Sequence, residues 1–187
     1  GLLLARLQAI PAPSVVRPGF PEVIDHLLTA LAQSAAFATG VIDPIWHAFQ
    51  SLVDAYPWDP DGSVSGHNDI NPYNVLFDGE RLWLIDWETA SRNDPFADLS
   101  CIVNNFVEPV AGTDESDLIS VLLGAWSARV PTGADRERLR QMRQMQRLYY
   151  GGLMFAVAGT EVTTKSGLHA LTPDQLRAAI EDGTIAV

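Results

Sequence analysis

The chain has 187 residues, of which 47% are hydrophobic, and this content is sufficient to bury the core of one large domain. It carries 12 basic residues against 23 acidic ones, and because the resulting net charge of −11 repels phosphate backbones we expect no nucleic-acid partner. The surplus of acid favours cationic small molecules, although an acidic surface often serves only solubility. The single cysteine, Cys101, cannot form an internal disulfide, which fits a reducing cytoplasm and a buried, inert thiol.

The first residues, GLLLARLQAIPA, hold only a short apolar run that Arg6 interrupts, and no basic leader precedes it. We therefore expect no targeting segment. Because the chain starts without Met, we expect residues 1–9 to be the end of a helix that begins upstream. The longest uncharged stretch, residues 26–42, contains Thr, Ser and Gln side chains and is too polar to span a membrane. These features predict a cytoplasmic chain with no membrane partner.

Two helices are predicted in the first third of the chain. The stretch PGFPEVIDHLLTALAQSAAFA places Pro21 near a first helical turn, as amphipathic helices often do. Its apolar residues recur at helical spacing, at Val23, Leu27, Leu28 and Leu31. A second helix is expected over residues 44–55, and the following YPWDPDGSVSG is expected to be a loop because Pro and Gly interrupt it.

The stretch NVLFDGERLWLID predicts a β-hairpin, because two apolar runs flank Asp78-Gly79, a dipeptide that supplies the positive φ angles of a tight turn. Helical patterns follow over residues 95–106, 114–128 and 133–158. The last of these stacks four side chains on one side, namely Leu139, Met142, Gln146 and Tyr149. A capping box at Thr172-Pro173-Asp174-Gln175 predicts a short terminal helix. We therefore predict an α+β, predominantly helical fold.

The stretch SGHNDINPYNVLF, residues 65–77, contains the candidate catalytic and metal-binding residues. His67, Asp69 and Asn74 follow the order H-x-D-x-x-x-x-N, in which the aspartate accepts a proton from an attacking hydroxyl and the asparagine oxygen binds Mg²⁺. Asp86 ends the second predicted strand, and because a hairpin returns to its starting end we expect it beside this loop. Three converging oxygen-bearing side chains suit a hard cation that bridges nucleotide phosphates. A polar turn before a hairpin is the alternative.

HNDINPYNVLF followed by LIDWETASRNDPFADLS resembles the signature of the aminoglycoside phosphotransferase and choline kinase superfamily, relatives of the protein kinases. The resemblance implies that residues 1–187 form the helical carboxy-terminal lobe of a protein-kinase-like fold, with a small β-hairpin at the catalytic loop. It also implies that Asp69 is the catalytic base and that Asn74 and Asp86 hold Mg²⁺, with ATP as the co-substrate.

Two further residues take structural roles by the same resemblance. His67 would brace the catalytic loop and the segment at Asp86 rather than transfer protons, and Asp98 would tether the following helix to the loop. Asp98 has an alternative role near a helix N-terminus, where a carboxylate is favourable in any case. The other histidines show no metal-ligand spacing and are expected to be ordinary structural or surface residues.

Protein kinases carry Asp-Phe-Gly at the second metal site and a later Ala-Pro-Glu. This chain has Asp86-Trp87-Glu88 and no Ala-Pro-Glu, which favours a small-molecule acceptor. It has no G-x-G-x-x-G, and its only lysine, Lys165, comes long after the catalytic loop. We therefore expect the amino-terminal nucleotide-binding lobe to be absent from this chain and residues 1–187 alone to be inactive. A non-catalytic relative is the alternative, although the retained metal ligands favour an enzyme.

The acceptor is inferred from charge and from aromatic side chains. Glu88 would face the acceptor pocket beside Asp69 if the backbone after Asp86 stays extended. Aromatic rings attract ammonium groups, and the candidates are Trp126, Tyr149 and Tyr150, each of which is alternatively an ordinary core residue. HND, together with IDWE and a following Asn93, resembles the choline and ethanolamine kinases more than the aminoglycoside enzymes, which more often read His-Gly-Asp. We expect an acceptor such as choline or ethanolamine, with an aminoglycoside or another hydroxylated metabolite as the alternative. The oligomeric state is left open.

Overall fold

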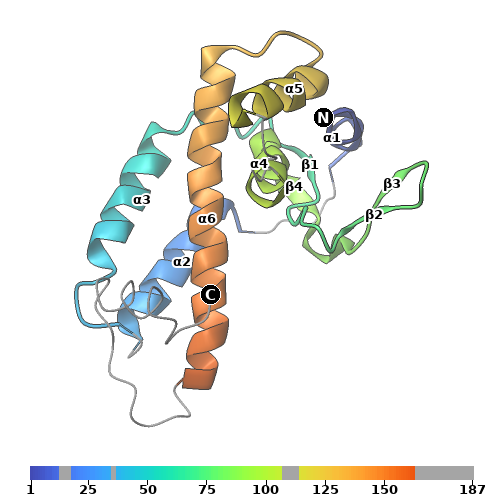
Figure 1. Ribbon diagram of the computed structural model, residues 1–187. Helices are drawn as coiled ribbons and strands as arrows, with labels where there is room; N and C mark the ends of the chain where they lie inside the picture. The colour runs from blue at the N-terminus through green and yellow to red at the C-terminus, as the bar shows by residue number, and fades with distance from the viewer. Residues whose placement is uncertain (13–17, 35–36, 107–113, 163–187) are drawn as a thin grey trace. The chain divides into compact units, whose positions relative to one another are not determined.

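The computed structural model describes residues 1–12, 18–34, 37–106 and 114–162, and Figure 1 shows the order of its elements. The chain divides into two compact units. The first contains Gly1–Gly19 and Tyr56–Arg147, and the second contains Phe20–Ala55 and Leu148–Val187. Helices make up most of the described chain, so the predicted α+β, mainly helical fold class is confirmed. None of the helices in the described ranges is long and apolar enough to cross a membrane.

The second unit contains α2 (Phe20–Gln33) and α3 (Asp43–Ala55), which pack against each other. Both helices were predicted, and both are confirmed. The residues that α2 buries are Phe20, Ile24, Leu28 and Leu31. Val23 and Leu27, which the sequence placed on the same apolar face, are only half-buried at its edge. A hydrogen bond of 2.9 Å from Trp46 Nε1 to Asp25 Oδ1 joins the two helices.

The helices of the first unit surround α4 (Pro95–Phe106), which packs against α1 (Leu2–Gln8) and α5 (Glu115–Ser127). Six consecutive residues of α4, 96–101, are buried, and burial raises the pKa of the Cys101 thiol to about 12. Helix α6 (Gly133–Val162) contributes to both units. The helices predicted at residues 95–106, 114–128 and 133–158 are confirmed to within a few residues. The predicted terminal helix lies outside the described residues.

The predicted hairpin is present as β2 (Val75–Phe77) and β3 (Leu82–Leu84), which pair antiparallel and end in a turn that Figure 1 shows in green. A hydrogen bond of 3.2 Å from the Asp78 N–H to the Arg81 carbonyl closes the turn, so it is tight as predicted. The positive φ expected at both residues of Asp78-Gly79 is found only at Gly79, at 100°. Asp78 instead uses its side chain, which accepts hydrogen bonds from the backbone N–H groups of Glu80 and Arg81 at 2.9 and 2.7 Å. Asp78 therefore stabilises the turn as an acceptor.

A second strand pair was not predicted. β1 (Val64–Gly66) pairs antiparallel with β4 (Ser91–Asn93), so that Gly66 lies opposite Ser91. The sequences VSG and SRN are small and polar, without the apolar alternation by which strands are identified. This pairing places the start of residues 67–74, which we call the motif loop, beside the chain that leads into α4.

An ion pair between the buried Asp94 and the half-buried Arg138 fixes the start of α4. Asp94 accepts a hydrogen bond from the Phe96 backbone N–H at 2.8 Å, as an N-cap does, and a second from the Tyr56 hydroxyl at 2.9 Å. Arg138 of α6 lies 2.5 Å from the other Asp94 oxygen, and its guanidinium stacks 4.8 Å from the centre of the Phe96 ring. Burial and the nearby Asp94 charge raise the pKa of Tyr56, which therefore remains a hydroxyl donor.

Replacing Arg138 by Met would leave the buried Asp94 carboxylate without its cation. We expect this change to lower the free energy of unfolding by about 3 kcal/mol, measured by urea denaturation. Arg140→Met is the matched control, because it removes a pair with Glu137 in which both side chains are about half exposed. The control should cost less than about 0.5 kcal/mol. Equal costs for the two variants would contradict a structural role for the Asp94–Arg138 pair.

Candidate active site

The motif loop begins where β1 ends, and α4 holds it there through Asp98. One Asp98 oxygen accepts the His67 backbone N–H at 2.9 Å, and the other accepts the Asn68 backbone N–H at 2.7 Å. Asp98 is only 1% exposed. Burial raises the pKa of its carboxyl, while the two backbone donors act in the opposite direction. The helix and the loop are thus joined by two hydrogen bonds to a buried carboxylate, at the position where the sequence predicted a tether.

His67 connects the motif loop to the residues on both sides of Asp86. Its Nε2 lies 2.9 Å from the Ile85 carbonyl oxygen, and because a carbonyl can only accept, Nε2 carries the proton. The His67 carbonyl accepts a hydrogen bond of 2.8 Å from the Thr89 hydroxyl, and its ring packs 4.7 Å from the Trp87 ring. The side chain is fully buried. These contacts suit a bracing residue better than a proton carrier.

Asp69 and Asn74, five residues apart in the motif loop, are in direct contact. Asn74 Nδ2 donates to Asp69 Oδ2 at 2.8 Å and to the Asp69 carbonyl at 3.0 Å. The Asn74 carbonyl accepts the Ile85 N–H at 3.1 Å, which ties the end of the loop to the end of the hairpin. Because the carboxamide nitrogen of Asn74 is directed at Asp69, its oxygen is the atom suited to face a cation.

Asp86 follows Ile85, the residue that bonds to both His67 and Asn74. It has a left-handed backbone with φ of 61°, and its side chain is exposed. A 3₁₀ turn, η1 (Trp87–Thr89), comes directly after it. The extended backbone that was expected to place Glu88 on the same side as Asp86 is therefore wrong. Glu88 is exposed, and strand alternation gives no argument for where it faces.

The donors near the motif loop fit a magnesium ion that is shared with a substrate. In the described part of the chain, no group of three or more His, Cys, Asp or Glu side chains could hold a metal by itself. The predicted ligands are instead the carboxamide of Asn74 and the carboxylate of Asp86, and Asp69, the predicted base, is in contact with Asn74. Mg²⁺ is typically held by one or two carboxylates together with substrate phosphates, so this donor set suits it.

The aromatic residues proposed for the acceptor have packing contacts. Trp126 donates from Nε1 to Gln8 Oε1 at 2.8 Å and packs edge-to-face on Phe96, with ring centres 5.3 Å apart. Its partners therefore belong to α1 and α4 rather than to the motif loop. Tyr149 and Tyr150 belong to the second unit, where Tyr149 packs against Phe20 at 5.2 Å. Tyr149 and Tyr150 also pack edge-to-face on each other, with ring centres 5.3 Å apart.

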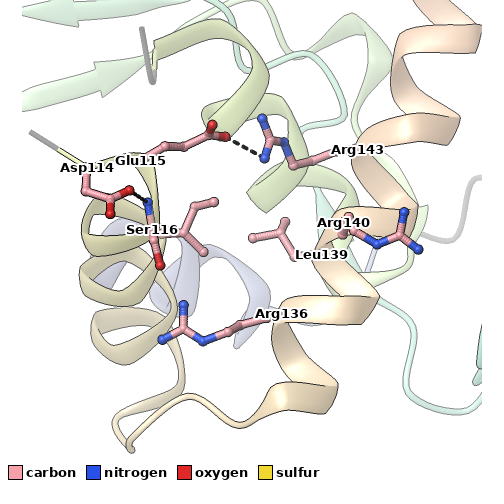
Figure 2. A pocket seen from close by; sticks show the side chains of 8 residues that line it. Asp114, Glu115, Ser116, Arg136, Leu139, Arg140 and Arg143 are labelled. Atoms are coloured by element: carbon pink, nitrogen blue, oxygen red, sulfur yellow. Dashed lines mark hydrogen bonds and ion pairs between the residues drawn. The ribbon is translucent and has the colours of Figure 1, made fainter. Parts of the chain in front are cut away.

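A cavity of about 380 Å³ lies between the first turn of α5 and α6, and Figure 2 shows its lining. Three arginines at helical spacing form one wall, namely Arg136, Arg140 and Arg143. They are engaged by protein groups: Arg143 pairs with Glu115 at 2.6 Å, Arg140 pairs with Glu137, and Arg136 donates to the Ser120 hydroxyl. None of the predicted site residues lines this cavity.

The sequence predictions gave no role to Asn68, the residue between His67 and Asp69. It has φ of 66°, and its side chain contacts Thr89, Ser91 and Asn93. A signal for the backbone exists in the sequence, because asparagine is one of the few residues that tolerate the left-handed region. The side-chain partners belong to the unpredicted strand β4 and the turn before it, so they could not be anticipated.

Comparisons with known proteins agree with this geometry. The model of the phosphotransferase enzyme family matches residues 1–140. A 37-residue segment is 46% identical to protein LicA of Haemophilus influenzae, covering 20% of this chain and 14% of LicA. The structure of a choline/ethanolamine kinase family protein from Mesorhizobium loti superposes with a TM-score of 0.69 at 20% identity, covering 96% of this chain and 56% of that one.

A macrolide 2′-phosphotransferase, MphH from Brachybacterium faecium, superposes with a TM-score of 0.53 at 21% identity, covering 84% of this chain and 52% of that one. The chain thus spans about half the length of both structures. At these identities the superpositions establish the fold, which is that of the helical lobe of kinase-like proteins.

Asp98→Ala would remove a buried carboxylate that accepts one buried backbone N–H, of His67, and one half-buried N–H, of Asn68. We expect the free energy of unfolding to fall by about 3 kcal/mol, because unsatisfied buried donors are costly. Asp114→Ala is the matched control: Asp114 also accepts a backbone N–H, from Ser116 at 2.9 Å, but it is an exposed N-cap whose loss should cost about 1 kcal/mol. If chemical denaturation gives Asp98→Ala no larger a cost than the control, the account of the tether is wrong.

Proposed function

The chain belongs to the phosphotransferase enzyme family, and from this membership we propose that the protein is an ATP-dependent kinase of small molecules. It transfers the γ-phosphate of ATP to a hydroxyl group of the acceptor, in the cytoplasm. The observation that carries the proposal is the contact between Asp69 and Asn74, in a loop that Asp98 and His67 hold against the segment of Asp86. A turn that only preceded a hairpin would not require these buried contacts.

Asp69 is proposed as the catalytic base. Its carboxylate orients the acceptor hydroxyl toward the γ-phosphorus and takes the hydroxyl proton, while a bond forms from the hydroxyl oxygen to phosphorus and the bond to the β,γ-bridging oxygen breaks, releasing ADP. The hydrogen bond from Asn74 at 2.8 Å holds one Asp69 oxygen and so fixes the direction of the carboxylate. Mg²⁺, held by Asn74 and Asp86, would neutralise phosphate charge.

The remainder of the nucleotide site is proposed to come from an amino-terminal lobe outside this chain. The chain spans 56% of the Mesorhizobium loti protein and contains no glycine-rich phosphate loop. We therefore expect phosphotransfer from the complete protein and none from residues 1–187 alone. A non-catalytic binding module is the second candidate, and the retention of Asp69, Asn74 and Asp86 argues against it.

The acceptor is proposed to be a small cationic alcohol such as choline or ethanolamine. Support comes from the net charge of −11 and from the described choline/ethanolamine kinase family membership of the Mesorhizobium loti protein. An aminoglycoside or another hydroxylated metabolite is the alternative, which the likeness to a macrolide phosphotransferase supports.

Asp69→Ala in the complete protein should lower kcat by about 100-fold or more, because the acceptor hydroxyl loses its base, while the affinity for ATP stays close to normal. Asp86→Ala should instead weaken ATP binding in magnesium and leave binding without magnesium little changed. Glu80→Gln, an exposed change on the hairpin turn, is the control for both. Near-normal turnover in Asp69→Ala, or an unaltered magnesium dependence in Asp86→Ala, would refute the corresponding role.

A panel of acceptors assayed for ADP release tests the charge argument. Choline and ethanolamine should be phosphorylated, and Glu88→Gln should raise KM for these cationic acceptors about fivefold, because one charge pair of about 1 kcal/mol is lost. KM for a neutral hydroxylated acceptor should not change in this variant. If neutral acceptors react and every cationic one is ignored, the proposed acceptor class and the role of Glu88 are both wrong.

A further inference from the structure

Asn68 occupies a backbone position that glycine would fill at lower cost. Its φ of 66° lies in the left-handed region, where a side chain is normally unfavourable. The residue is half-buried between His67 and Asp69. Because the backbone alone would favour glycine here, the contacts of the side chain are the feature that asparagine adds.

The carboxamide of Asn68 uses both its nitrogen and its oxygen. Nδ2 donates to the Thr89 carbonyl at 3.0 Å and to the Ser91 hydroxyl at 2.9 Å. Oδ1 accepts a hydrogen bond from Asn93 Nδ2 at 2.8 Å. The Thr89 carbonyl can only accept, which fixes the nitrogen on that side. The backbone N–H of Asn68 donates to Asp98, so the residue is also bound to α4.

Three partners of the Asn68 side chain, Thr89, Ser91 and Asn93, follow Asp86 in the chain, in η1 and β4. A longer hydrogen bond of 3.5 Å goes from Nδ2 to the Gly66 carbonyl. On its other side Asp86 follows Ile85, which bonds to His67 and Asn74. The residues before Asp86 are therefore tied to the motif loop through Ile85, and those after it are tied to the loop through Asn68. We infer that Asn68 is a positioning residue that sets Asp86 relative to Asp69, an inference that rests on the proposed function of these two carboxylates.

Gly66 provides independent support for the rigid placement of this carboxamide. A Cβ atom added at Gly66 would lie 2.7 Å from Asn68 Oδ1, closer than real Cβ contacts allow, and 3.3 Å from its Cγ, a tight contact. Gly66 is the last residue of β1, and a glycine in a strand often marks a site that another group approaches closely. Gly66 leaves room for the Asn68 side chain, so the two positions are coupled.

Asn68 and Asn93 are the two asparagines of the pattern that resembles choline and ethanolamine kinases. The pattern HND with a following Asn93 carries the resemblance to choline and ethanolamine kinases, and the structure brings these two asparagines into hydrogen-bond contact. A glycine between His67 and Asp69 would keep the left-handed backbone and lose this link. We therefore assign the asparagine pair to the positioning of the site rather than to direct contact with the acceptor.

Two variants in the complete protein separate positioning from stability. Asn68→Gly removes the carboxamide and keeps the backbone conformation, whereas Asn68→Ala removes the carboxamide and also strains the backbone. If Asn68 positions Asp86, both variants should lower kcat by a similar factor of about 10- to 100-fold and raise the magnesium concentration for half-maximal activity. Only Asn68→Ala should lose much stability, and KM for the acceptor should stay within about twofold of the parent.

A stability cycle measures the contact without any assay of activity. Gly66→Ala should raise the unfolding equilibrium constant about 30-fold in the parent, because the new Cβ overlaps the carboxamide, and much less in the Asn68→Gly background. Gly133→Ala is the control, because a Cβ at Gly133 meets no atom within 4 Å.

The results of these experiments separate the proposed phosphotransfer from the positioning role of Asn68. A parent protein that transfers no phosphate would overturn the proposed function. An active parent with unchanged kcat and magnesium dependence in Asn68→Gly would overturn the positioning role alone. A fall in kcat that follows the loss of stability, large in Asn68→Ala and absent in Asn68→Gly, would likewise overturn it, as would equal effects of Gly66→Ala in both backgrounds.

Discussion

The carboxylate of Asp98 accepts the backbone N–H groups of both His67 and Asn68, and through these two bonds α4 holds the start of the motif loop. The helix is itself fixed at its first turn, where Asp94 caps it and pairs with Arg138 of α6. Because α4 is covered by α1, α5 and β1, its position is set by packing before the loop is considered. The rigid part of the unit thereby determines where Asp69 lies.

The motif loop and the segment around Asp86 are connected through backbone groups of that segment rather than through charged side chains. The residues on either side of Asp86 are held through the Ile85 carbonyl and N–H and through the Thr89 carbonyl, by bonds to His67, Asn74 and Asn68. None of these bonds uses a carboxylate oxygen of Asp69 or Asp86. Two residues with positive φ, Asn68 and Asp86, belong to the segments that these bonds join. The local strain is offset by the contacts that it permits.

The sequence predicted the helices and the hairpin well, because amphipathic spacing and the run of apolar residues around Asp78-Gly79 are local signals. It also placed Asp69 and Asn74 in one short loop, and the structure brings these two side chains into contact. It failed where a partner distant in sequence decides the conformation. The β1–β4 pair unites two polar tripeptides, and the turn at Asp86 depends on contacts with His67 and Asn68, so neither the pairing nor the position of Glu88 could be read from local pattern.

The central claim is that the motif loop and Asp86 form one site for a magnesium nucleotide. The most direct measurement is a crystal structure of the complete protein with Mg²⁺ and a non-hydrolysable ATP analogue. The account predicts a magnesium ion bound by the Asn74 carboxamide oxygen and the Asp86 carboxylate, with the γ-phosphate facing Asp69 and the bonds from Asp98 to the loop intact. A magnesium nucleotide whose metal is bound by neither Asn74 nor Asp86 would contradict it.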